Sequence, residues 1–328
     1  MKRILKNILV IYPVKFFTTT SSTVINLIGA KNEKPLIRTE VARMMYGIFF
    51  ILLMFAGDRL LSDALQAVNN KSHFRFSRIY NQTAQSEIVL IGNSRGHTLY
   101  QPAIREFTGT NTINLSYNAL PVAIANALVA DYYDFYAPPK KLVIEVSMLN
   151  KTELNVINEF KLYIRNSERI RSVIQSNSRR TATAVSIVNL YSFNTELFHR
   201  SLYYLGKDDI DWILDKKINK GMVENRDGIE SMTFEITDDR LKDLSSLVQK
   251  AKEKNTEVKL VLAPYYPAYR QKIANLNSFI STIESKTGLK VHDYSSMITA
   301  DEFFSDYLHL NKNGSKLFIS KLHQDGIL

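Results

Sequence analysis

Short apolar runs alternate along most of the chain with longer segments in which apolar residues recur at helical spacing. Continuous apolar runs bounded by turn residues are typical of parallel strands covered on both faces. Such runs predict strands at 87–94, 112–117, 141–147, 258–266 and 290–295, and helical spacing predicts helices at 123–136, 238–254, 269–286 and 312–323. Strands alternating with helices indicate an α/β fold, a three-layer α/β/α sandwich around a mostly parallel five-stranded sheet.

Residues from about 150 to 235 interrupt this alternation, because no long apolar run occurs there. The pattern predicts a helical insertion after the third strand. Between residues 161 and 180 the insertion carries six basic residues against the single acid Glu168. This charge run is compatible with a solvated helix face, and equally with a platform for an anionic polymer or for lipid headgroups.

The most hydrophobic stretch of the chain is MMYGIFFILLMFAG, residues 44–57, which contains no charged residue. With the apolar residues beside it, the stretch reaches about 20 residues, enough to span a bilayer as a helix. A buried core helix could have the same composition. The basic residues before the stretch follow the positive-inside pattern. We therefore predict a cytoplasmic segment at 1–43, a single-pass membrane anchor at 44–61, a connector at 62–84 and an extracytoplasmic domain at 85–328.

Composition narrows the function classes open to the chain. Of its 328 residues, 45% are hydrophobic and 23% are charged, as in globular proteins. The lack of cysteine excludes a disulfide framework and thiolate chemistry, and the six histidines lack metal-ligand spacing, so no metal or other cofactor is predicted. The net charge is +10, but +6 of it lies in residues 1–43. A nucleic-acid partner is therefore not expected, since its binding site would usually be a basic folded domain.

Two short motifs carry candidate chemistry. GNSRG, residues 92–96, ends the first predicted strand and matches G-x-S-x-G, the nucleophile elbow of α/β-hydrolases. No HGGG-type loop accompanies it, and its second glycine, Gly96, is interpreted as a turn residue. Asp306 and His309 stand three residues apart, a spacing that lets the carboxylate hold imidazole Nδ1 while Nε2 faces a hydroxyl. Loops that follow parallel strands meet at one sheet edge, so Ser94, His309 and Asp306 are predicted as nucleophile, base and orienting acid.

These residues also have simpler interpretations. Ser94 could cap the helix that follows it, or the free N–H groups there could bind a phosphate, although the loop lacks the lysine of a P-loop. His97 could act as the base or only line the site, since no carboxylate lies near it in the sequence. Arg95 could contact an anionic substrate or be solvated. Arg95 and His97 are therefore kept as candidates for substrate binding.

The motifs resemble those of the SGNH, or GDSL-like, hydrolase superfamily over about 85–147 and 256–323. Gly92-Asn93-Ser94 resembles the first block of that family, with Asn93 in place of the usual aspartate. NLSYNA, residues 114–119, resembles the second block, whose final glycine donates a backbone N–H to an oxyanion and falls here on Ala119. DYLH, residues 306–309, resembles the last block, which supplies the acid and base. The resemblance implies a flavodoxin-like sheet and a Ser–His–Asp triad.

The third block departs from the family pattern. VIEVSMLN, residues 143–150, should carry an asparagine near its end, but the matching position is Leu149 and the asparagine, Asn150, comes one place later. The resemblance therefore implies an oxyanion hole made by the N–H groups of Ser94 and Ala119, with the side chain of Asn118 or Asn150 as a further donor.

The resemblance fits the membrane-anchored branch that is similar to D-alanyl-lipoteichoic-acid and exopolysaccharide O-acetylation proteins. It implies a serine esterase or O-acyltransferase that acts through an acyl-serine on a cell-surface polysaccharide or related acylated polymer. A membrane-bound acyltransferase is a further expected partner. The alternative is a non-catalytic accessory protein of a polymer-modification complex. The displaced Asn150 favours that alternative, whereas the presence of Ser94, Asp306 and His309 argues against it.

Overall fold

The computed structural model describes residues 35–150 and 154–328. Predictions for residues 1–34, and with them most of the basic N-terminal segment, lie outside the described residues. The chain divides into two compact units, Met1–Ala56 and Gly57–Leu328, and the second holds the whole sheet.

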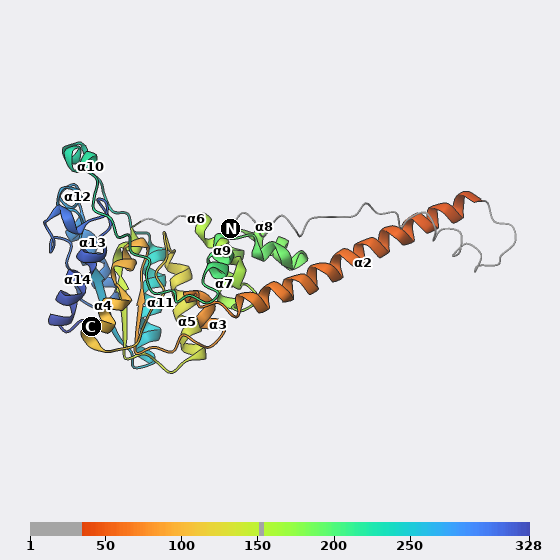
Figure 1. The fold of residues 1–328 in the computed structure, drawn as a ribbon, viewed down its shortest axis with the longest axis horizontal. Coiled ribbons are helices and arrows are strands. Elements are labelled where there is room, and N and C mark those ends of the chain that lie inside the picture. Colours follow the sequence, from red (N-terminus) through yellow and green to blue (C-terminus); the bar gives the residue numbers. More distant parts are fainter. Residues whose placement is uncertain (1–34, 151–153) are drawn as a thin grey trace. The chain divides into compact units, whose positions relative to one another are not determined.

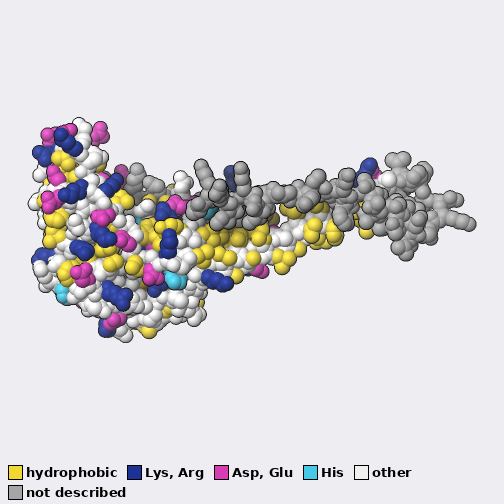
Figure 2. Space-filling view, viewed as in Figure 1, with side chains coloured by type: hydrophobic (Ala, Val, Ile, Leu, Met, Phe, Trp, Pro, Cys, Tyr) yellow, Lys and Arg dark blue, Asp and Glu magenta, His cyan; other side chains and the backbone are white. Residues whose placement is uncertain are grey.

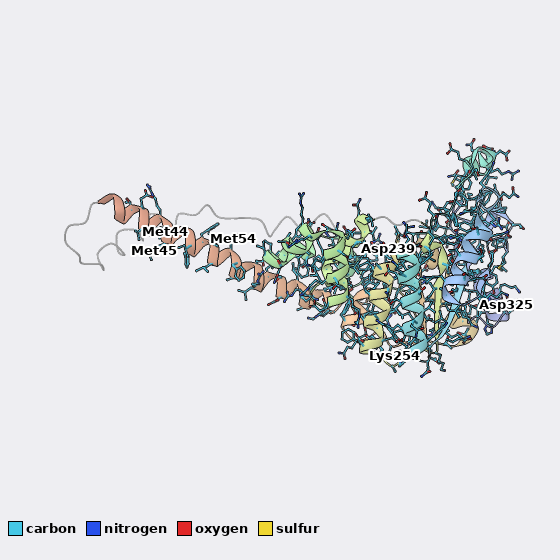
Figure 3. The ribbon with its side chains drawn as sticks, turned by 180° about the vertical axis from the view of Figure 1, so that it is seen from behind. Met44, Met45, Met54, Asp239, Lys254 and Asp325 are labelled. Atoms are coloured by element: carbon cyan, nitrogen blue, oxygen red, sulfur yellow. The ribbon has the colours of Figure 1, made fainter. Side chains whose placement is uncertain are left out.

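The apolar stretch lies in one long helix, α2, over Pro35–Asn69. An apolar window within Thr39–Asn69 has a mean hydropathy of 1.7, and none of it is buried. Large apolar side chains from Met44 to Phe55 are between 49% and 67% exposed. Figure 2 shows hydrophobic side chains on the surface of this helix, and Figure 3 shows Met44, Met45 and Met54 projecting from it. This stretch is not the buried core helix that the composition also allowed. It is a helix long and apolar enough to serve as a membrane anchor.

The sheet has five strands in the order β2-β1-β3-β4-β5, and each neighbouring pair is parallel. The strands are β1 Ile88–Ile91, β2 Thr112–Asn114, β3 Lys141–Glu145, β4 Glu257–Leu262 and β5 Val291–Asp293. Four strands fall within the predicted runs and β4 begins one residue before its run, so the predicted parallel α/β sheet is confirmed. This order is the flavodoxin-like one, in which the chain changes direction across the sheet at β1 and β3 and leaves a crevice at their carboxyl ends.

Alternate residues of the central strands enter two separate cores, which makes the fold three-layered (Figure 1). On β1, Val89 and Ile91 pack on one face, and Ile88 and Leu90 pack on the other. The first face is covered by α3 Arg75–Tyr80, α5 Val122–Phe135, α11 Asp238–Glu253 and α13 Leu276–Thr287. The second is covered by α4 Gln101–Thr108 and α14 Lys312–Gln324. Burial on both faces explains why the strands are continuous apolar runs.

The segment after β3 is helical, as predicted. It contains α6 Leu154–Glu159, η4 Phe160–Tyr163, α7 Glu168–Asn177, α8 Arg179–Ile187, η5 Asn189–Phe193, α9 Glu196–Tyr203, α10 Lys220–Glu224 and η6 Arg226–Gly228. It is less regular than the sequence indicates, and the predicted helix at 269–286 is likewise two helices, α12 Pro267–Gln271 and α13. Ile273, between them, forms a parallel bridge with Met232, a pairing that local spacing cannot reveal.

Residues 62–84, interpreted above as a connector, are part of the folded unit. Phe74 and Phe76 are fully buried and their rings meet edge to face, with centroids 5.2 Å apart. The polar residues around them mask this pattern in the sequence. Burying two aromatic rings contributes several kcal/mol, so this segment helps to stabilise the domain.

Candidate active site

The nucleophile candidate lies directly beyond the central strand β1. The chain passes from Gly92 to Asn93 and then enters η2, a 3₁₀ helix over Ser94–Thr98. A Cβ on Gly92 would lie 2.8 Å from the Cβ of Glu145 on β3, so only glycine fits this crossing. Asn93 caps the helix, since its side chain accepts a hydrogen bond from the Arg95 N–H at 2.9 Å. Asn93, not Ser94, is therefore the capping residue, which leaves the Ser94 hydroxyl available.

Gly96 is more than the turn residue that the sequence indicated. A Cβ at this position would lie 2.8 Å from the Cβ of buried Ser116, which follows β2. The requirement for glycine here comes from close packing of η2 on the neighbouring chain segment. The second glycine of the motif thus sets how near η2 lies to the 114–119 segment.

The acid and base candidates lie on a tight loop before α14. Ser305 N–H donates to the His309 carbonyl at 2.9 Å, and Phe304 and Leu310 form an antiparallel bridge that closes the loop. Asp306 Oδ1 accepts from the N–H groups of Leu308 and His309 at 2.8 and 2.9 Å. The same carboxylate therefore shapes the loop and holds the imidazole.

Ser94, His309 and Asp306 form a continuous hydrogen-bonded chain. His309 Nε2 lies 2.9 Å from Ser94 Oγ, and His309 Nδ1 lies 2.9 and 3.0 Å from the two Asp306 carboxylate oxygens. Burial acts to raise the pKa of Asp306, but its bonds to His309 and to the backbone outweigh burial and lower the pKa below the ordinary value. A charged Asp306 accepts a hydrogen bond from Nδ1–H. The proton of the neutral ring is therefore on Nδ1, and Nε2 is free to accept the proton of the serine hydroxyl. This is the arrangement needed to activate a serine.

The three side chains line a cavity of about 570 Å³. Asn118, Ala119 and His97 line it too, but Asn150 is not among the described residues that do. The Asn150 side chain instead accepts from the Glu235 N–H at 2.9 Å. The expected oxyanion role of Asn150 is thus not supported by its position. A larger cavity, about 680 Å³, is lined by residues of α4 and of the 70–83 segment and contains none of the three triad candidates.

Ala119 has a left-handed backbone with φ of 52°. Such a conformation is costly for a residue with a Cβ, which gives a physical reason for glycine in the resembled block. Among the described residues, no hydrogen bond engages the Ala119 N–H, and Ser94 as the first residue of η2 has no partner for its own N–H within that helix. Both N–H groups are therefore available to an anionic oxygen in the cavity.

A buried ion pair sets the orientation of Asn118. Arg75 and Asp209 are 3% and 0% exposed and form a bidentate pair at 2.8 and 2.9 Å. Arg75 Nη1 also lies 3.5 Å from His97 Nδ1, and because a guanidinium can only donate, this contact favours the tautomer with the proton on Nε2. His97 Nε2–H then donates to Asn118 Oδ1 at 3.3 Å, which leaves the Asn118 NH₂ group for the cavity.

The electrostatics of His97 agree with this tautomer. Burial and the neighbouring Arg75 lower the pKa of His97 to about 3, so the ring is neutral over the physiological range. A histidine that stays neutral beside a fixed positive charge is poorly suited to accept a serine proton. The structure places His97 on the cavity wall next to Asn118, and His309 rather than His97 contacts Ser94.

Arg95, a candidate for substrate binding, faces the interior instead. Its side chain is 5% exposed and its guanidinium lies over the Tyr265 ring, 3.4 Å from the centroid. It donates to the carbonyl groups of Leu308, Ala263 and Pro264. Arg95 therefore cannot meet a substrate in the cavity. The sequence could not show this, because the three carbonyl groups belong to residues more than 160 positions away from Arg95 in the chain.

The insertion supplies cavity residues that sequence reasoning missed. Arg200 comes from α9, and Trp212, Ile213 and Leu214 follow it. Trp212 is the single tryptophan of the chain, and its indole donates to Asp209. An isolated tryptophan in a segment without periodicity gives no signal of this role.

In residues 35–150 and 154–328, no cluster of three or more metal-ligand side chains occurs.

Comparisons with known proteins add little. No protein-family model matches the chain, and no curated protein matches it. Among solved structures, one similar chain is described as "The structure of a putative platelet activating factor from Streptococcus pneumonia". It shares 13% identity with a TM-score of 0.39, over 87% of this chain and 99% of the other. A likeness this weak establishes neither family nor activity, so the site is assigned on its own geometry.

Proposed function

We propose that this protein is a serine-dependent esterase or O-acyltransferase. The observation that carries the proposal is the hydrogen-bonded chain from Asp306 through His309 to Ser94, at the carboxyl end of β1 and on the wall of a cavity. That edge of a parallel sheet is where α/β proteins bind ligands.

In the proposed reaction, Ser94 Oγ attacks an ester carbonyl while its proton passes to His309 Nε2. Asp306 stabilises the imidazolium that forms. The oxyanion receives hydrogen bonds from the N–H groups of Ser94 and Ala119 and from the Asn118 amide. The bond to the leaving alcohol then breaks, and that alcohol takes the proton from His309. The acyl-serine passes its acyl group to water, or to a second hydroxyl, by the reverse steps.

The substrate we propose is an acyl ester on a cell-surface polysaccharide or related polymer, reached from a membrane anchor and alongside a membrane-bound acyltransferase. Support comes from the apolar helix α2, which would hold the domain at the membrane. Support also comes from the cavity wall, where Arg200 and Asn118 provide polar groups and Trp212 an aromatic one. Such a mixture suits a sugar, because polar side chains bind its hydroxyl groups and an aromatic ring packs on its apolar face.

The test is to treat the purified full chain with a fluorophosphonate and to map the adduct by mass spectrometry. We expect an adduct on Ser94 that disappears in Ser94→Ala and forms at least about 10³-fold more slowly in His309→Ala. Ser172→Ala, which removes an exposed serine on α7, is the matched control and should label normally. If a control serine esterase is labelled but Ser94 is not, the chain is instead the non-catalytic accessory protein.

Incubation with an acetylated polysaccharide would then separate the two activities. Released acetate indicates hydrolysis, whereas acetyl groups gained by an added sugar acceptor indicate transfer.

A further inference from the structure

Hydrogen bonds join the helical insertion to the first turn of α2 after the apolar stretch. The Asp58 carboxylate accepts from the N–H groups of Asn189 and Leu190, each at 2.9 Å. One residue further, Arg59 donates to the Ile187 carbonyl at 3.3 Å. All of these residues belong to the Gly57–Leu328 unit. The segment 187–190 is therefore held next to the point where the chain leaves the apolar stretch.

A second attachment lies slightly further along α2. Arg165, between η4 and α7, forms an ion pair with Asp63 at 2.8 Å. From Asp58 to Asp63 a helix rises about 7.5 Å. The headgroup layer on each side of a bilayer is about 5–8 Å thick. With residues 44–57 in the hydrocarbon, both attachments fall at the depth of the lipid headgroups.

The surface at this depth contains a basic cavity of about 370 Å³. Arg165, Arg171 and Arg179 line it, and all three side chains are exposed. Thr183 and Ser186 add hydroxyl groups, which with the guanidinium groups are the donors that bind a phosphate. Arg169 does not contribute, because two carboxylates, Asp131 and Asp134, hold it, and Lys161 is buried. Arg165 and Arg171 each pair with one exposed carboxylate, Asp63 and Glu168, and a guanidinium has five N–H donors, so each keeps donors for a phosphate.

Apolar side chains lie beside this cavity without entering the core. Ile187 and Val188 are 62% and 45% exposed, and Tyr191 is 38% exposed. They belong to the same segment that Asp58 and Arg59 hold. Exposed aliphatic and tyrosine side chains next to arginines are typical of surfaces that lie in the membrane interface.

We propose that the insertion binds the anionic phospholipids of the membrane in which α2 is anchored. The three cavity arginines hold lipid phosphate, and Ile187, Val188 and Tyr191 enter the interface. This inference rests on the membrane span of the proposed function but not on its chemistry.

The test uses the full chain in nanodiscs of phosphatidylcholine alone or mixed with phosphatidylglycerol. Hydrogen–deuterium exchange is measured for peptides covering 164–191. We expect slower exchange in the anionic discs, and we expect Arg171→Gln/Arg179→Gln to weaken the lipid effect by about fivefold per arginine. The matched control is Lys242→Gln/Lys252→Gln, which removes two exposed charges from α11 and should change nothing.

Three outcomes would overturn the proposal. Equal exchange in both kinds of disc would show that anionic lipid is not bound. Equal protection from inorganic phosphate in phosphatidylcholine discs would mean that a free anion is the ligand. Failure of the chain to remain in any disc would remove the membrane span itself. Fluorophosphonate labelling of Ser94 is measured in the same samples, so a failure of the lipid proposal is distinguishable from a failure of the proposed chemistry.

Discussion

In the proposed reaction, the Asn118 side chain takes the place of a displaced oxyanion donor. The third-block asparagine, Asn150, lies away from the cavity and is bonded to Glu235, so it leaves the oxyanion with two backbone donors. Asn118 lies on the cavity wall, and the proton on His97 Nε2 decides which end of its amide faces inward. Arg75, 3.5 Å from Nδ1, favours the proton on Nε2. In the proposed reaction, the side chain that serves as the third donor would thus be oriented by a buried charge outside the cavity.

The role of His97 can be tested by the hydrogen bond it donates. We expect His97→Leu to lower the rate of fluorophosphonate labelling of Ser94 by about 10- to 100-fold, less than the roughly 10²–10³-fold loss from removing the donor itself in Asn118→Leu. His97→Gln should recover most of the rate, because a glutamine amide can also donate to Asn118 Oδ1. Melting temperatures serve as the control for folding.

The pH profile separates this positioning role from general-base catalysis. Since the pKa of His97 is about 3, the wild type and His97→Gln should lose activity over the same pH range. A profile that shifts with His97 would instead make it the base. An undiminished rate in His97→Leu would mean that Asn118 needs no orientation.

What the sequence predicts of the site depends on how local each contact is. Asp306 and His309 are predictable because three residues in a loop bring a carboxylate to an imidazole, and Ser94 because it ends an apolar run. The interior position of Arg95 is not predictable, because its bonds to the 263–264 and 308 carbonyls need the finished sheet. The packing role of Gly96 is not predictable for the same reason, since Ser116 follows the neighbouring strand β2.

Among the secondary structure elements, Arg95 joins the carboxyl ends of three strands to the loop that carries the base. Its guanidinium starts from η2 after β1, faces Glu145 of β3 at 3.6 Å and donates to Ala263 after β4. Its bond to the Leu308 carbonyl lies next to His309 in the chain. The strands themselves were predictable as apolar runs, but this connection between their ends was not. Through it, the residue after Ser94 is bonded to the residue before His309.

Removing the Arg95 side chain should therefore destabilise the folded domain. Arg95→Leu leaves Glu145, which is 0% exposed, as an uncompensated buried charge, and we expect a loss of about 3–5 kcal/mol in the free energy of unfolding. Arg105→Leu on α4 removes an exposed arginine and should stay within about 0.5 kcal/mol. Urea unfolding of the full chain in detergent measures both. Equal stability of the two variants would show that Arg95 is not a structural link.

At the scale of the whole molecule, the division at Ala56 falls within α2, between its apolar stretch and the unit that holds the sheet and the candidate site. The sequence predicted an apolar helix of spanning length ahead of the α/β domain, because length and hydropathy are local properties. It did not predict that residues 62–84 belong to the domain, since Phe74 and Phe76 stand alone among polar residues. Which side of the membrane holds the domain follows from charge alone, and therefore stays a prediction.

Because the chain has no cysteine, single introduced cysteines can show directly on which side of the membrane each segment lies. Lys242, whose side chain is 70% exposed on α11, samples the domain, and Lys31 samples the basic segment before the apolar stretch. In intact spheroplasts, a membrane-impermeant maleimide should label Lys242→Cys at once and Lys31→Cys only after lysis. The reason is that the eight basic residues of 1–43 hold that segment on the cytoplasmic side. The opposite pattern would place Ser94 in the cytoplasm, where no cell-surface polymer could reach it, and would exclude the proposed substrate while leaving the serine chemistry intact.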